Sequence, residues 1–235
     1  MIRRKLIGSN IDIDQERNHS FNLDTVLLAK FLKLPARLNT LLDVGTGNGA
    51  LLLYASEMTK ANLFGVEIQE ERFQMAKHNI ELNHLEHRSQ LILGDYLNTT
   101  FKNLDCIICN PPFFKTAHED QLSLETSDQI ARHEQTLSLS KLIAKVSEQL
   151  KFGGYFYMVH RADRFAEIVF ECKKHQLAIK RVKFVHPYLD KKANHVLIQC
   201  IKNGKDSLVL EPPLILYKDK HEHTDMFHAY IKGDI

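Results

Sequence analysis

Short apolar runs alternate with amphipathic helical patterns along most of this chain of 235 residues. The runs have the length of buried strands, and between them apolar residues recur at helical spacing, as in 70–82 and 139–150. This alternation predicts an α/β fold with a mostly parallel, doubly wound central sheet and helices on both faces. The strand-like runs lie at 40–44, 62–68, 89–95, 104–110, 153–159, 178–186, 194–201 and 207–212.

The last three runs follow one another without helices between them. Short connections join antiparallel strands, so we expect these final strands to pair antiparallel at one edge of the sheet. Residues 114–137 form a long, polar stretch with poor periodicity. A loop of that length inside a compact domain is usually functional or mobile.

The composition, with 44% hydrophobic and 26% charged residues, fits one globular domain over residues 1–235. No run has the length of a membrane span, and the basic start MIRRKLIGSN lacks an apolar segment, so we expect a cytoplasmic protein without a membrane partner. Cys106 and Cys109 lie three apart on a predicted strand and should point to opposite faces, as buried packing residues rather than a zinc or redox pair. No histidine spacing indicates a metal site.

Charge is divided unevenly along the chain. Residues 1–150 contain 16 lysines and arginines against 19 acids, whereas residues 151–235 contain 15 against 10. The excess of basic residues in 151–235 indicates either a solvated face or a weak binding surface for an anionic polymer such as RNA.

A glycine-rich turn and three acids mark the ends of the first three predicted strands. Gly45 and Gly47 follow Asp43, and glycines there let the backbone turn tightly and approach a ligand beyond the sheet. Glu67 ends the second strand, where an acid can bind both ribose hydroxyls, and Asp95 ends the third, where a carboxylate can accept from an adenine amino group. The spacing of the glycines differs from the dinucleotide-binding pattern, and Asp43 favours a cationic ligand. S-adenosylmethionine, which carries a cationic sulfur, therefore fits this turn.

The segments LDVGTGNG, GVEI, GDY and CNPPFF, in this order and spacing, resemble class I methyltransferases. The resemblance implies a Rossmann-like fold whose mostly parallel, seven-stranded sheet has an antiparallel edge. The Asn-Pro-Pro-Phe tetrapeptide at 110–113 marks members that methylate a planar nitrogen, such as a nucleobase amine or the side-chain amide of glutamine.

The chemistry of a nucleobase amine explains these residue types. The Asn110 side-chain oxygen and the Pro111 carbonyl can accept its two N–H bonds and aim the lone pair at the sulfonium methyl. Pro111 and Pro112 fix the turn. Phe113 or Phe114 can stack on an extruded base, which is worth about 1–3 kcal/mol.

The segments ARHEQTLSLSKLI, HRADRF and HPYLDKKANHVLIQCIKNGK resemble one subgroup most, the tRNA1(Val) adenine-37 N6-methyltransferases and their close relatives, and this resemblance implies tRNA as the partner. FNLDTVLLAKF is similar to the part that closes over the methionine end of the cofactor, within residues 1–35, ahead of a catalytic core at 36–160 and a possible RNA-contact region at 161–235. The sequence has Phe113 where many relatives have Tyr, and Asn22-Leu23 where many have Gly-Thr. We expect the cofactor at Asp24, Thr25, Asp43, Gly45, Thr46, Gly47, Glu67, Ile68, Asp95, Tyr96 and Asn110. We expect RNA at Phe113, Phe114, Arg132, Arg161, Arg164, Lys191 and Lys192.

Several alternatives share the tetrapeptide. Glutamine-N5 methyltransferases normally carry an extra N-terminal helical domain, for which a glycine turn at Gly45 leaves no room. DNA adenine enzymes normally carry a larger target-recognition domain. An rRNA guanine-N2 enzyme is barely distinguished by the motif, and a scaffold without turnover is disfavoured by the intact tetrapeptide.

Overall fold

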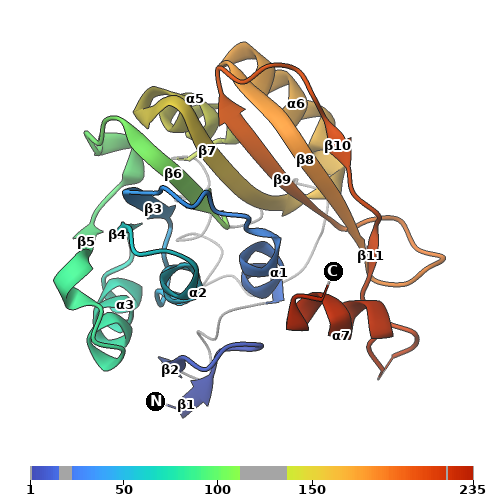
Figure 1. The fold of residues 1–235 in the computed structure, drawn as a ribbon, viewed down its shortest axis with the longest axis horizontal. Coiled ribbons are helices and arrows are strands. Elements are labelled where there is room, and N and C mark those ends of the chain that lie inside the picture. The colour runs from blue at the N-terminus through green and yellow to red at the C-terminus, as the bar shows by residue number, and fades with distance from the viewer. Residues whose placement is uncertain (1, 16–22, 112–136, 221, 235) are drawn as a thin grey trace, which may run out of the picture.

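A central sheet lies between two layers of helices (Figure 1). This computed structural model describes residues 2–15, 23–111, 137–220 and 222–234. Its strands are β1 (Ile2–Lys5), β2 (Asp12–Gln15), β3 (Thr40–Val44), β4 (Asn62–Glu67), β5 (Ser89–Leu93), β6 (Leu104–Cys109), β7 (Leu150–Arg161), β8 (Leu177–His186), β9 (His195–Lys202), β10 (Val209–Leu210) and β11 (Leu214–Ile215). Its helices are α1 (Leu23–Phe31), α2 (Ala50–Met58), α3 (Glu70–Leu82), α5 (Leu139–Gln149), α6 (Phe165–Lys174) and α7 (Asp225–Lys232), with short 3-10 turns η1 (Glu86–Arg88), η2 (Tyr96–Asn98) and η3 (Ala162–Arg164).

The strand order of the main sheet is β10-β8-β9-β7-β6-β3-β4-β5, and β11 also pairs with β8. The central strand β3 is parallel to both β4 and β6, β5 is parallel to β4, and β7 is parallel to β6. The carboxyl ends of these strands therefore meet on one side of the sheet, which is where ligands bind in open α/β folds.

The predicted α/β fold, mostly parallel with helices on both faces, is confirmed. The run at 194–201 forms β9, which pairs antiparallel with β7 and β8 and lies two strands in from the edge formed by β10. The prediction for the run at 207–212 is wrong, because only Val209–Leu210 form a strand and this strand is parallel to β8. One side of β8 is already paired with β9, which ends beside the beginning of β8, where Lys202 pairs with Leu177. The chain that leaves β9 therefore takes the open side of β8 from that end and runs in the same direction.

Each face of the sheet packs on its own hydrophobic cluster. One cluster joins α1, α2 and α7, and the other joins α5 and α6. Cys106 and Cys109 are fully buried and belong to opposite clusters, which confirms their predicted placement. Burial raises the pKa of both thiols, as expected of inert packing residues. No helix within the described ranges is long and apolar enough to span a membrane.

The hairpin of β1 and β2 is tied to α3 and to the glycine turn by Asn79, whose side chain is fully buried. Its Oδ1 accepts from Asp14 N at 2.8 Å, and its Nδ2 donates to the carbonyls of Asp14 and Asn48, both at 2.9 Å. The Asp14 carboxylate also pairs with Arg3 and His78, each at 2.8 Å, and both hold its pKa well below the usual range. The hairpin is therefore fixed beside the turn that follows β3.

Gly65 in β4 lets α2 approach the sheet closely. A Cβ at this position would lie 2.7 Å from Leu91 Cδ2, 3.0 Å from Leu52 Cδ1 and 3.1 Å from Thr46 Cγ2. We expect Gly65→Ala to lower the free energy of unfolding by about 1–3 kcal/mol, because the neighbouring side chains must move. Urea denaturation monitored by circular dichroism tests this, and an unchanged midpoint with an unchanged slope would contradict it.

Candidate active site

The turn between β3 and α2 places glycine backbone, without side chains, at the carboxyl ends of the parallel strands. Gly45 and Gly47 have φ of 71° and 57°, in the left-handed region that favours glycine. Among the described residues, no atom lies within 4 Å of a Cβ built on Gly45, and the nearest to one on Gly47 is Arg72 Nη1 at 3.9 Å. The turn thus offers space for a ligand to approach the backbone.

Asp43, the fourth residue of β3, is a buried carboxylic acid at the base of this turn. Its Oδ2 accepts from the Thr46 hydroxyl at 2.8 Å, while its Oδ1 has no hydrogen-bond partner among the described residues. Burial raises the pKa of Asp43 to about 7, the Thr46 hydrogen bond opposes the rise, and the charge of Glu67 adds to it. A buried acceptor without a partner is unfavourable unless a donor or cation reaches it.

Glu67 closes the glycine turn from the end of β4. Its Oε2 accepts from Gly47 N at 2.8 Å, and its Oε1 accepts from the backbone N–H groups of Ile68 and Gln69, both at 2.9 Å. The side chain of the neighbouring Ile68 is 41% exposed. Three backbone donors therefore fix the carboxylate, and its Oε2 keeps a lone pair for a further donor.

Asp95 follows β5 and caps η2, where its Oδ1 accepts from Leu97 N at 2.9 Å. The adjacent Tyr96 packs into the hydrophobic cluster under α5, and burial raises its pKa well above the usual value. Its side chain therefore faces the core, and a ligand contact from Tyr96 is left to its backbone.

Asn110 leaves β6 beside the glycine turn, because Val44 and Cys109, the last residues of β3 and β6, pair in register. Its Nδ2 donates to the Thr25 hydroxyl at 3.0 Å. The first turn of α1 also carries Asp24, so the segment predicted to close over the cofactor does meet the end of the predicted catalytic strand. Pro111 follows directly within the described chain.

Four of the five cations predicted to contact RNA lie in the described part of the chain, and three of these four are paired with acids. Arg161 binds Asp163 through two nitrogens at 3.1 and 2.6 Å, and Arg164 binds Glu167 at 2.6 and 2.7 Å. Lys191 Nζ lies 3.0 Å from the carboxylate of the preceding residue. The side chain of Lys192 is exposed. A phosphate would have to compete with these carboxylates, so the predicted contacts remain predictions.

Four predicted site residues lie outside the described part of the chain. They are Pro112, Phe113, Phe114 and Arg132. The predicted long loop at 114–137 also falls almost wholly outside it. Within the described ranges, no group of three or more histidine, cysteine or acidic residues is placed to hold a metal ion.

Residues 19–185 match the family model described as the methyltransferase small domain. The chain belongs to this family. In this chain Asp43, Glu67, Asp95 and Asn110 lie at or just beyond the carboxyl ends of four neighbouring parallel strands, β3, β4, β5 and β6.

Similar curated proteins share one name. A tRNA1(Val) (adenine(37)-N6)-methyltransferase of Porphyromonas gingivalis is 31% identical over 166 residues, which are 66% of this chain and 63% of that protein. A protein of the same name from Phocaeicola vulgatus is 26% identical over 211 residues, 89% of this chain and 87% of that protein. This methyltransferase small domain therefore spans less than two thirds of the Porphyromonas protein but most of the Phocaeicola one.

Solved structures share the fold. A protein of Agrobacterium tumefaciens described as a predicted O-methyltransferase has a TM-score of 0.68 at 21% identity, covering 90% of this chain and 96% of that one. The geranyl diphosphate C-methyltransferase of Streptomyces coelicolor, solved with S-adenosyl-L-homocysteine, has a TM-score of 0.57 at 13% identity, covering 76% and 74%. These likenesses place the methyltransferase small domain in the Rossmann-like fold.

Sequence reasoning missed three polar residues of this methyltransferase small domain. His195, the first residue of β9, lies 3.2 Å from Asp24. Gln15 and Asn48, beside Asp14 and the glycine turn, each have a buried amide atom without a partner among the described residues. No local pattern distinguishes these positions, because each acquires its neighbours through contacts between distant parts of the chain.

Proposed function

We propose that this protein is an S-adenosylmethionine-dependent N-methyltransferase that modifies N6 of adenine at position 37 of a tRNA, in the cytoplasm. The observation that carries the proposal is Asn110, held at the carboxyl end of β6 beside the glycine turn and bonded to Thr25. The names of the similar curated proteins support the target, and the basic carboxyl-terminal third supports an RNA partner.

The described residues fit S-adenosylmethionine, which supplies an electrophilic methyl group on a cationic sulfur when bound. Asp43 Oδ1, buried and without a partner among the described residues, suits the positive end of this ligand. The Glu67 carboxylate, fixed by three backbone donors, is placed to accept from ribose hydroxyls. Asp95 lies just beyond the end of β5, where its carboxylate can accept a hydrogen bond from the adenine amino group. Gly45 and Gly47 leave room for the ligand against the backbone.

Asn110 orients the amine that is methylated. Its Nδ2 stays with Thr25, and its Oδ1 then accepts one N–H of the substrate while the Pro111 carbonyl accepts the other. These contacts localise the nitrogen lone pair and stabilise the positive charge that develops as the methyl group arrives. The methylated ammonium loses its proton to water, so no strong base is required. The aromatic partner of the base is assigned to Phe113 or Phe114.

Transfer of labelled methyl groups into undermodified tRNA, followed by nucleoside analysis, tests the proposal. We expect N6-methyladenosine, mapped to position 37. Label in guanine N2 of rRNA or in a protein glutamine would replace the target with one of the alternatives. Cofactor binding without transfer to any of these would overturn the enzymatic function itself.

Cofactor affinity is expected to depend on the ionisation of Asp43, whose pKa burial raises to about 7. A cation binds the ionised form, which rises from about 3% at pH 5.5 to about half at pH 7, so the Kd should fall about tenfold over that interval. Because this pKa lies above its unfolded value, the acid stabilises the unliganded fold at low pH and loses that contribution as the pH rises through 7. Isothermal titration calorimetry measures how the Kd changes with pH. Asp43→Asn should reduce this change, and an equal change in both proteins contradicts the assignment.

A further inference from the structure

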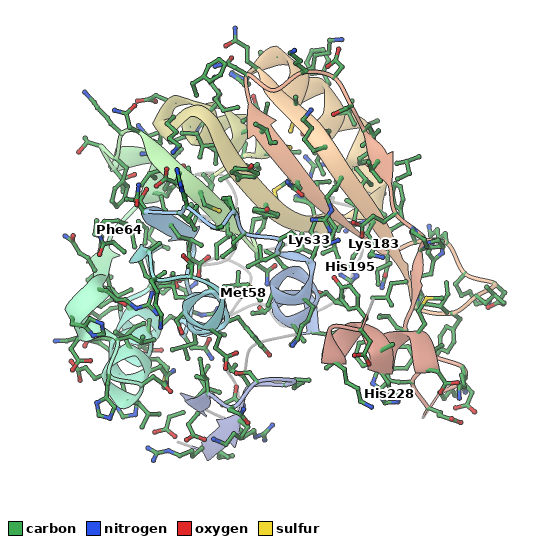
Figure 2. All side chains as sticks on the ribbon, in the orientation of Figure 1. Lys33, Met58, Phe64, Lys183, His195 and His228 are labelled. Atoms are coloured by element: carbon green, nitrogen blue, oxygen red, sulfur yellow. The ribbon has the colours of Figure 1, made fainter. Side chains whose placement is uncertain are left out.

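Strand β9 carries one imidazole to the ligand side of the sheet. His195 is its first residue, and the backbone there pairs with Arg161 at the end of β7 and Val185 near the end of β8. Because β9 is antiparallel to its neighbours, its beginning lies where the parallel strands finish. Figure 2 shows His195 next to α1.

The His195 imidazole contacts an acid in the first turn of α1. Its Nε2 lies 3.2 Å from Asp24 Oδ1, with the two side chains only 18% and 12% exposed. Burial raises the pKa of Asp24, and His195 opposes that rise. Removing a partner from a buried carboxylate is unfavourable, so the imidazole helps to fix the position of Asp24.

The same turn of α1 contacts the proposed catalytic asparagine. Thr25, the next residue, accepts from Asn110 Nδ2 at 3.0 Å. One turn further, the Leu27 carbonyl accepts from the Tyr230 hydroxyl of α7 at 2.9 Å. A helical turn moves as a unit, so a displacement of Asp24 also displaces Thr25 and the hydrogen bond that orients Asn110.

We propose that His195 is a positioning residue, which through Asp24 holds the first turn of α1 in the place that binds S-adenosylmethionine and orients Asn110. The inference rests on the proposed function for the identity of the cofactor. It assigns part of the cofactor's affinity to a side chain from the carboxyl-terminal third of the chain.

A double-mutant cycle on cofactor binding tests the inference. We expect His195→Ala and Asp24→Ala each to raise the Kd for S-adenosylmethionine about tenfold, as for loss of a charge-assisted hydrogen bond, and the double variant to bind no more weakly than the worse single one. His195→Gln, which keeps an N–H donor, should restore binding to within about threefold of the original protein. His186→Ala is the matched control, because His186 lies next to Val185 on β8 and bonds to the Lys191 carbonyl.

Calorimetric Kd values and thermal unfolding are measured for each variant, and methyl transfer follows as a second readout. Additive effects in the double variant, or a His195→Ala Kd within twofold of the original, would overturn the inference. A loss of affinity in His195→Gln equal to that in His195→Ala would do the same. If the original protein binds the cofactor yet methylates no RNA, the proposed function fails while the coupling in Kd still decides this inference.

Discussion

Asn110→Ala is expected to reduce methyl transfer to tRNA by about 100-fold to 1,000-fold, the effect of removing one group that stabilises developing charge in a transition state. The Kd for S-adenosylmethionine should change by less than about threefold, because the Asn110 oxygen acts on the substrate amine and the pair of Asp24 with His195 still holds the first turn of α1 when the bond to Thr25 is lost. Single-turnover transfer of labelled methyl groups and calorimetry measure the two quantities separately.

Two further variants isolate the cause. Asn39→Ala makes the same substitution at an exposed position at the amino end of β3, and it should leave transfer unchanged. Thr25→Val removes the hydroxyl that accepts from Asn110 Nδ2 without changing the volume, and we expect a loss of about tenfold. Transfer by Asn110→Ala at near-normal rates would exclude the asparagine from the reaction and assign the orientation of the amine to other groups.

Glu67→Gln is expected to weaken S-adenosylmethionine binding by about tenfold to a hundredfold. The new amide must place its NH2 group against one set of backbone donors, either Gly47 N or the pair from Ile68 and Gln69. The amide NH2 group and a backbone N–H donor then face each other, which shifts the glycine turn. The negative charge that the carboxylate offers to the ribose hydroxyls is also lost. The free energy of unfolding should also fall by about 1–3 kcal/mol.

The control for this substitution is Glu81→Gln on the exposed face of α3, which should alter neither affinity nor stability. Calorimetry and urea denaturation provide the two measurements. If Glu67→Gln destabilises the fold but binds the cofactor normally, the carboxylate serves the turn alone and the ribose contact is lost from the proposal.

The part of the site that the sequence predicted comes from short-range patterns. Asp43, Glu67 and Asp95 each lie at or just beyond the end of an apolar run, and strand pairing in register brings those ends together. The direction of β10 was not predictable from its own residues, because it is set by where β9 ends relative to β8 and by which side of β8 remains open. The orientation of the Tyr96 side chain was not predictable from its own neighbours in the sequence either, because α5 and the sheet bury it.

The contacts made by α1 are the clearest case of information that local patterns lack. The sequence predicted that Asp24 and Thr25 would lie near the cofactor, yet nothing near them indicates His195. Arg181 reaches the Phe31 carbonyl across 150 residues, and its guanidinium stacks 4.3 Å from the Phe31 ring. Such pairs arise only when the whole sheet is assembled.

The separation between α1 and its partners has a consequence for biosynthesis. This helix leaves the ribosome well before α7, because the hydroxyl that binds its Leu27 carbonyl follows 203 residues later. Contacts between such distant residues form slowly, after the local ones. A nascent chain that has made β3 to β6 therefore has the glycine turn but lacks the contact that joins α1 to α7, and the set of contacts that holds α1 beside Asn110 is completed only after Tyr230 has been translated.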